Sequence, residues 1–176
     1  MGDAMGGRAA RLAVWVARPR KAAHLCLAPK LRLLDLLPAA EVTKTLDWLN
    51  GQLPPKANLP AKRVFIGECG LSWTACGSDG KIHEQKNREI FTKFLSWRPP
   101  LVLYWQVYNN EVVDGQQVGF WLVDNKNKKT PLYETMKELF VQQEEAAKEM
   151  RRRSNRLPAF EQIAEFSENW LAQKGK

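Results

Sequence analysis

The residues best suited to chemistry follow two apolar runs of the sequence. In the first run, Arg63–Glu68, the carboxylate of Glu68 comes last and is followed by Cys69 and Gly70. A carboxylate that closes an apolar strand is costly to bury without a partner. Its position therefore indicates either a functional group or a solvated strand end, and the pattern alone leaves both interpretations open.

The second run, Leu101–Val107, ends in a mixture of aromatic, amide and acidic residues. They are Trp105, Tyr108, Asn109 and Glu111. Aromatic rings can stack on the C–H faces of sugars, while amides and carboxylates bind hydroxyl groups. Trp73, in the loop after the first run, is a further candidate. Together these residues predict a carbohydrate site, although core packing would explain Trp105 alone and a turn would explain Glu111 alone.

The elements that must position these residues alternate between strand and helix. Both apolar runs have the continuous apolar character of buried parallel strands. Apolar residues at helical spacing predict helices over Ala40–Leu53, Lys81–Trp97, Leu132–Met150 and Ala159–Leu171. Thr130 is predicted to cap the third helix, with Pro131 at its first position and Met136, Leu139 and Phe140 inward. This order predicts an α/β fold with a parallel sheet, whose carboxyl end is where function collects.

The composition of the chain limits the kinds of partner that it is expected to bind. The chain has 176 residues, a size that suits one domain, and a net charge of +8. Much of the excess charge lies in residues 1–40, and no nucleic-acid-binding motif accompanies it. No apolar stretch reaches the 18 residues of a membrane span. We therefore expect no nucleic acid and no membrane as partners.

Cysteine and histidine usage argues against a metal or a disulfide framework. The 3 cysteines have no repeated spacing, and the 2 histidines, His24 and His83, are far apart. We expect no metal and no cofactor. No credible signal peptide is visible, so a cytoplasmic location is the default, and secretion is the alternative if a native N-terminus precedes this one.

Four short segments carry a family resemblance. They are Val64–Gly70 (VFIGECG), Leu103–Glu111 (LYWQVYNNE), Val118–Asp124 (VGFWLVD) and Lys129–Tyr133 (KTPLY). In this order they resemble strand seven, strand eight, the following loop and the start of helix eight in retaining glycoside hydrolases. The clan in question is the large (β/α)8 clan that includes cellulase-like and mannanase-like enzymes. The resemblance covers about Val42–Phe140.

The resemblance implies roles for the candidate residues. Glu68 would be the nucleophile of a double-displacement reaction, and Trp105 would line the sugar subsite. Tyr108, Asn109, Glu111 and Trp73 would contact the substrate. Retaining enzymes hold a second carboxyl group, the acid/base, about 5–5.5 Å from the first. In the family it follows strand four, for which this sequence offers no counterpart. Glu84, Glu111 and Asp124 are the nearest acidic residues by sequence.

The same resemblance implies a partial (β/α)8 TIM barrel. A complete barrel takes about 250 residues. We expect an irregular or disordered extension over residues 1–38, with some helix around Ala9–Val16, then a partial barrel over 39–150 and a helical tail over 151–176. A further strand within Ala23–Leu34 is the alternative. The open barrel edges predict self-association. Hydrolysis of O-glycosidic bonds is the expected activity, and a non-catalytic carbohydrate-binding or interaction remnant is the alternative.

Overall fold

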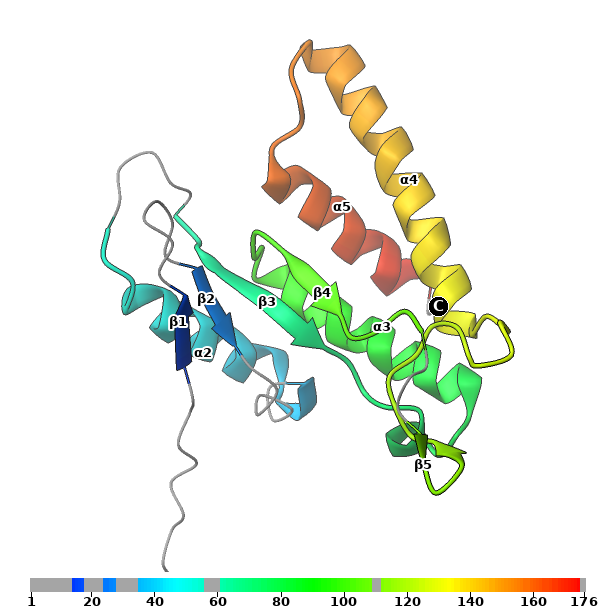
Figure 1. Cartoon of the computed structure of the whole chain (residues 1–176). Helices are drawn as coiled ribbons and strands as arrows, with labels where there is room; N and C mark the ends of the chain where they lie inside the picture. The colour runs from blue at the N-terminus through cyan, green and yellow to red at the C-terminus, as the bar shows by residue number, and fades with distance from the viewer. Residues whose placement is uncertain (1–13, 18–23, 28–34, 56–60, 109–111, 175–176) are drawn as a thin grey trace, which may run out of the picture.

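The centre of the fold is a sheet of 4 strands in the order β1-β2-β3-β4. A computed structural model describes residues 14–17, 24–27, 35–55, 61–108 and 112–174. The strands are β1 (Val14–Ala17), β2 (His24–Leu27), β3 (Val64–Cys69) and β4 (Val102–Tyr104). β1 runs antiparallel to β2, whereas β2, β3 and β4 are parallel to one another (Figure 1). The expected α/β class is confirmed at this coarse level.

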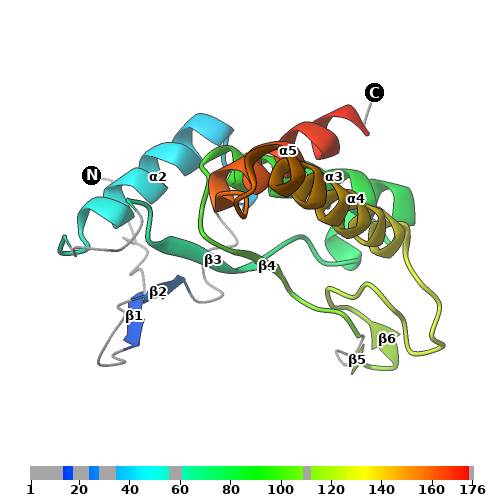
Figure 2. The same cartoon turned by 90° about the horizontal axis from the view of Figure 1, so that it is seen from above.

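The helices of the described residues cover one face of this sheet (Figure 2). They are α2 (Ala39–Gly51), α3 (Gly80–Ser96), α4 (Pro131–Ser154) and α5 (Phe160–Gln173). A short 3-10 helix, η2 (Thr74–Cys76), precedes α3, and a small hairpin, β5 (Val112–Val113) and β6 (Gln116–Gln117), follows β4. Each strand β2, β3 and β4 is thus followed by a helix, as in the βα units of a parallel sheet.

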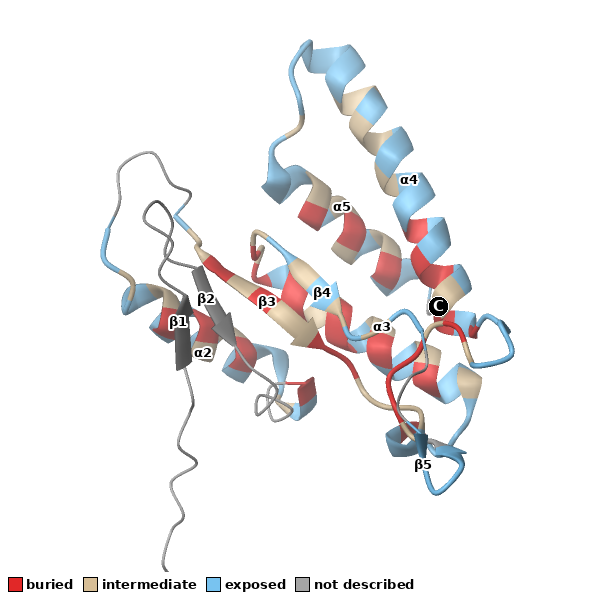
Figure 3. Cartoon of the chain, in the orientation of Figure 1, coloured by how far each residue is buried: buried red, intermediate tan, exposed pale blue. Residues whose placement is uncertain are grey.

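The core lies between the sheet and the helices (Figure 3). Val64 and Ile66 of β3 pack with Leu46 of α2 and Phe94 of α3, and all of these are almost fully buried. Leu171 of α5 belongs to the same apolar cluster. The last helix therefore shares the core of the chain, through its contacts with α3 and α4.

Two strands lie within residues 1–38, for which an irregular or disordered segment was expected. Val14–Val16, part of the predicted helix, lie in β1, while residues 9–13 lie outside the described residues. β2 lies within Ala23–Leu34, where a strand was the alternative prediction. Both strands are only 4 residues long, too short for their apolar pattern to distinguish strand from helix. Pairing decides their conformation: β1 pairs with β2, and β2 pairs with β3, a partner that is not local in sequence.

The four predicted helices form, and Ile82, Phe140 and Phe160, expected on their apolar faces, are exposed. The Thr130 hydroxyl accepts a hydrogen bond from the Tyr133 N–H at 3.2 Å, and Pro131 begins the helix, which confirms the predicted cap. Phe140, predicted to point inward, is 59% exposed. The buried stripe follows the spacing of Leu132, Thr135, Met136 and Leu139. Phe140 lies about 100° around the helix from its neighbour Leu139, outside that stripe.

The second apolar run does not form one strand. β4 ends at Tyr104 instead of Val107. Beyond it, the Leu122 N–H donates to the Gln106 carbonyl at 3.2 Å and to the Val107 carbonyl at 3.0 Å. After Trp105 the chain no longer pairs with β3, because the Gln106 and Val107 carbonyls pair with Leu122, in the segment before α4. Among the helices that the structure describes, none combines the length and apolarity needed to cross a membrane.

Candidate functional site

The ends of β3 and β4 coincide. In the parallel register Ile66 pairs with Val102 and Cys69 pairs with Tyr104, with an irregularity between the two pairs. The Trp105 N–H donates to the Cys69 carbonyl at 3.4 Å. Glu68 precedes one member of the last pair and Trp105 follows the other. Both residues therefore stand at the carboxyl end of the sheet, on neighbouring strands.

Glu68 and Trp105 also share a face of the sheet. Val64, Ile66 and Cys69 of β3 are buried on the helix side, and Tyr104 of β4 packs against Phe91 of α3 at a ring distance of 5.9 Å. Successive side chains of a strand point to opposite faces. The irregularity between Ile66 and Cys69 interrupts the alternation counted from Val64 and Ile66, so that Cys69 joins the same buried cluster. Counted from Cys69 and Tyr104, the partly buried Glu68 and the 45% exposed Trp105 lie on the helix-free face. Leu101 and Leu103 share that face, each 44% exposed.

Asp35 brings a second carboxylate to this end of the sheet. It follows β2 in the chain, is 8% exposed, and accepts a hydrogen bond from the Gly70 N–H at 3.3 Å. Burial, and then the charges of Asp35 and Glu68, raise the pKa of the Cys69 thiol well above its usual value.

Lys93 of α3 fixes the segment that carries Asp35. Its ammonium group donates to the backbone carbonyls of Asp35 (2.6 Å) and Leu37 (2.7 Å). Burial lowers the pKa of Lys93, and the charge of Asp35 opposes this effect. Sequence reasoning missed Asp35 as a site residue. The available signal was an acidic residue flanked by leucines on both sides.

A buried polar network supports the turn after Glu68. The Asn87 side chain accepts from the Leu71 N–H at 2.7 Å and donates to the carbonyls of Leu71 (3.2 Å) and His83 (2.8 Å). His83 Nε2 lies 3.2 Å from the Tyr104 hydroxyl. Burial lowers the pKa of His83 to about 4 and raises that of Tyr104.

Sequence reasoning also missed the two buried members of this network. His83 and Asn87 are both fully buried. They are four residues apart and continue the inward stripe of Ile90, Phe91 and Phe94 on α3. Polar residues inside an apolar helical stripe are the signal that could have marked them.

The predicted site residues divide into three groups. Glu68 and Trp105 come together, and Tyr108, 65% exposed, follows Trp105 closely in the chain. Asn109 and Glu111 lie outside the described residues. Trp73 packs against Trp121 (5.1 Å between ring centroids) and His83 (5.5 Å), and it lines a separate cavity with none of the other predicted residues.

Two of the acidic residues considered as partners of Glu68 have structural roles instead. Glu84 accepts from the Arg88 guanidinium at 3.1 Å and from the Thr135 hydroxyl at 3.0 Å, within the contacts of α3 and α4. Asp124 accepts from the backbone N–H groups of Lys126 and Lys128, both at 2.8 Å. Within the described ranges, no group of three or more His, Cys, Asp or Glu residues is arranged to hold a metal ion.

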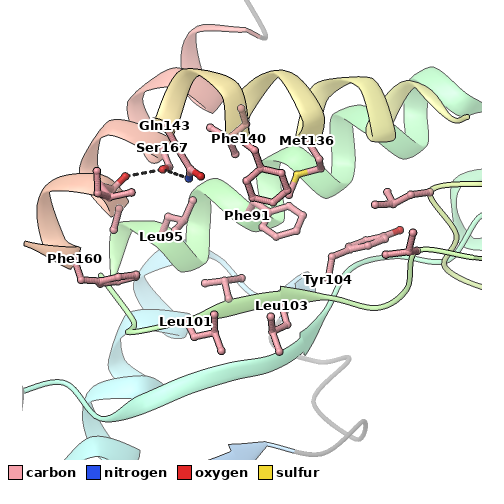
Figure 4. Close-up of a pocket in the computed structure, with 16 residues that line it drawn as sticks. Phe91, Leu95, Leu101, Leu103, Tyr104, Met136, Phe140, Gln143, Phe160 and Ser167 are labelled. Atoms are coloured by element: carbon pink, nitrogen blue, oxygen red, sulfur yellow. Dashed lines mark hydrogen bonds between the residues drawn. The ribbon is translucent and has the colours of Figure 1, made fainter. Parts of the chain in front are cut away.

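An apolar pocket of about 360 Å³ lies beside β4, the edge strand of the sheet. Its walls include Leu103 of β4, Phe91 of α3, Phe140 of α4 and Phe160 of α5 (Figure 4). At its rim the Gln143 amide donates to the Ser167 hydroxyl at 2.6 Å, and that hydroxyl donates to the Ile163 carbonyl. With its polar groups already paired, this pocket is poorly suited to bind a sugar.

Comparisons with known proteins do not assign the chain. No family model, no curated protein and no solved structure matches it.

Proposed function

We propose that this chain acts on carbohydrate as a retaining glycoside hydrolase-like protein, with Glu68 as the nucleophile. The observation that carries the proposal is the Cys69–Tyr104 pair, which puts Glu68 and Trp105 at the same end and on the same face of neighbouring parallel strands. An indole beside a carboxylate suits a sugar ring whose anomeric carbon faces that carboxylate.

The arrangement of helices and strands also supports the proposal, at a coarser level than the residues do. In a (β/α)8 barrel the helices lie outside the strands, and the catalytic groups lie at the carboxyl ends. Here the helices cover one face, and the candidate residues lie on the opposite face at the carboxyl end. We propose that β3 and β4 correspond to strands seven and eight of such a barrel. The described residues form 4 strands in this sheet, whereas a closed barrel has eight.

The proposed reaction has two steps. The Glu68 carboxylate attacks the anomeric carbon, the glycosidic C–O bond breaks, and the leaving oxygen takes a proton from a general acid. Water then hydrolyses the glycosyl ester and releases the sugar. General acid catalysis contributes typically about 10²–10⁴-fold. Activated leaving groups need little of that help, so they are the right probes for Glu68 alone.

The test is intact-mass analysis after incubation with 2-fluoro glycosides that carry activated leaving groups. Reagents of the gluco, manno and galacto series should be compared, with Glu68→Gln as the control. We expect one added glycosyl mass on the wild type and none on the variant. Soluble, folded protein that gains no mass from any reagent would refute Glu68 as a nucleophile.

Carbohydrate binding without cleavage is the second candidate. The exposure of Trp105 (45%) and Tyr108 (65%) favours it, because an exposed aromatic ring can stack on a sugar without any acid. In that case affinity electrophoresis through polysaccharide gels would retard the wild type and not Trp105→Ala, while no covalent adduct forms.

Self-association is part of the same proposal. β4 is an edge strand, and Leu101, Leu103 and Phe140 are half-exposed beside it. A second copy covering this edge would remove apolar surface from water. Phe140 and Trp48 are equally exposed, at 59%, and only Phe140 lines the pocket. Light scattering should therefore show that Phe140→Glu lowers the mass of the assembly and that Trp48→Glu does not. A monomeric wild type would exclude self-association.

A further inference from the structure

A second cavity, of about 770 Å³, lies where α3 and α4 begin. The first residues of these helices touch: a Cβ on Gly80 would lie 3.1 Å from Pro131 Cδ. Because α3 follows β3 and α4 follows β4, the cavity belongs to the same carboxyl end of the sheet as Glu68. Its walls combine indole rings, ammonium groups and carboxylates, and its charged lining residues are Asp79, Lys81, Asp124, Lys128, Lys129 and Glu134.

The ammonium groups of the cavity are available to a ligand. Lys81, Lys128 and Lys129 take part in none of the ion pairs found in the described part of the chain. Lys129 lies over the Tyr133 ring, with its ammonium nitrogen 4.8 Å from the centroid. Three ammonium groups that form no ion pair, two of them adjacent in sequence, can bind an anionic group.

The cavity also holds three carboxylates, so its formal charge is balanced, but its two aspartates bind backbone N–H groups and form no ion pair with the three lysines. Asp79 Oδ1 accepts from the N–H groups of Lys81 (2.8 Å) and Ile82 (2.9 Å), which lowers the pKa of its carboxyl group. Asp124 Oδ1 accepts two further backbone N–H groups. The bonds to each carboxylate end on Oδ1, so Oδ2 is open to a hydroxyl donor.

The indole side of the cavity offers an apolar wall. Trp73 is partly buried, and its ring is tilted by 33° against that of Trp121, which is 3% exposed. This contact fixes Trp73 and leaves part of its ring facing the cavity. Such a wall suits the C–H face of a sugar ring.

We infer that this cavity binds an anionic saccharide, a sugar that carries a carboxylate or a sulfate group. The lysines bind the acidic group, the free carboxylate oxygens and Glu134 accept sugar hydroxyls, and Trp73 packs on the ring. A neutral sugar would not engage the charge of the three ammonium groups, and a simple anion would not use the indole or the carboxylates. The inference rests on the proposed carbohydrate function and names its substrate class.

The turn that supplies two of the lysines also supplies a matched control. Lys126 lies on the same turn as Lys128 and Lys129, is exposed, and does not line the cavity. Substitution by glutamine removes the charge and keeps most of the length. The pair of variants is therefore Lys128→Gln/Lys129→Gln against Lys126→Gln. Trp73→Phe, which keeps an apolar ring in the cluster, tests the wall.

The experiment is isothermal titration calorimetry with four probes. They are an oligogalacturonate, a heparin-derived oligosaccharide, cellohexaose and inorganic sulfate. We expect tighter binding of one acidic oligosaccharide than of cellohexaose, a loss of about tenfold or more in Lys128→Gln/Lys129→Gln, and less than about twofold in Lys126→Gln. Trp73→Phe should weaken the same probe.

Three outcomes would overturn the inference. Equal weakening by Lys126→Gln would mean a general effect of the positive charge. Equal affinity for cellohexaose would remove the acidic preference. Sulfate binding as tight as that of the oligosaccharides would indicate a simple anion site. If the wild type binds the acidic probe while no 2-fluoro glycoside labels Glu68, the hydrolase proposal is refuted and this inference stands.

Discussion

Cys69 pairs with Tyr104 across the parallel strands β3 and β4, at the last position of both strands. Their side chains point into the helix layer, where Tyr104 meets Phe91 of α3. Their neighbours Glu68 and Trp105 are consequently placed on the helix-free face. The candidate site therefore depends on how firmly this end of the sheet is held, which can be tested residue by residue.

Gly70 should tolerate no side chain. Its φ is +128°, and a Cβ there would lie 2.6 Å from Tyr104 Cε2 and 2.9 Å from Asn87 Oδ1. We expect Gly70→Ala to lower the free energy of unfolding by about 3 kcal/mol, from crowding and backbone strain together. Gly77 has a φ of +66° with nothing within 4 Å of its Cβ. Gly77→Ala should therefore cost only about 1 kcal/mol. Urea denaturation measures both, and equal losses would contradict the crowding.

Asn87 should be essential because it pairs both backbone groups of Leu71. In Asn87→Leu, the buried N–H and carbonyl lose their partner, and we expect a loss of about 3 kcal/mol. Gln85 lies on the exposed side of the same helix, so Gln85→Leu should change stability by less than about 0.5 kcal/mol. Thermal unfolding followed by circular dichroism would compare the two. A similar melting temperature for Asn87→Leu and the wild type would refute a supporting role.

His83 should make stability depend on pH. Burial lowers its pKa from the usual 6.5 to about 4, so the folded chain keeps the ring neutral where the unfolded chain protonates it. The free energy of unfolding therefore keeps its full value above about pH 6.5. It falls by up to about 3 kcal/mol as the pH decreases towards 4, because protonation of His83 favours the unfolded chain. Urea midpoints between pH 7 and pH 4 should fall more steeply for the wild type than for His83→Gln. Parallel curves would show that His83 does not titrate in this way.

Replacing Trp105 should weaken ligand binding and should change the free energy of unfolding only a little. Trp105 is 45% exposed, and Leu103, two residues earlier and on the same face, is 44% exposed. Both alanine variants should fold, since each residue buries only part of its side chain. We expect Trp105→Ala to weaken oligosaccharide binding by about tenfold, because it removes a stacking surface, and Leu103→Ala to leave it nearly unchanged. Titration calorimetry measures this difference, and equal effects would argue against a specific subsite.

The elements with strong local patterns could be predicted from the sequence. The helices α2, α3, α4 and α5 have apolar residues at helical spacing over three or more turns, and β3 is a compact apolar run between loops. β1 and β2 could not be predicted in this way. Their 4-residue runs are stable only as part of the sheet, and the charged residues around them hide the pattern.

Only the candidate site residues that lie at the ends of strands could be predicted from the sequence. Glu68 and Trp105 close apolar runs, so their position was visible in the sequence. Asp35 reaches the site through a hydrogen bond to Gly70, a partner 35 positions away. The role of Trp73 depends on its contact with Trp121, which is equally non-local. Such contacts depend on tertiary packing, which periodicity does not reveal.

Peptide mapping of the 2-fluoroglycosyl adduct examines the proposed nucleophile itself. Labelled protein would be digested at low pH, to preserve the ester, and the modified residue located by tandem mass spectrometry. We expect the added mass on Glu68, no adduct in Glu68→Gln, and slower labelling in Trp105→Ala than in Leu103→Ala. An adduct on another carboxylate such as Asp35, or labelling that persists in Glu68→Gln, would contradict the assignment of Glu68.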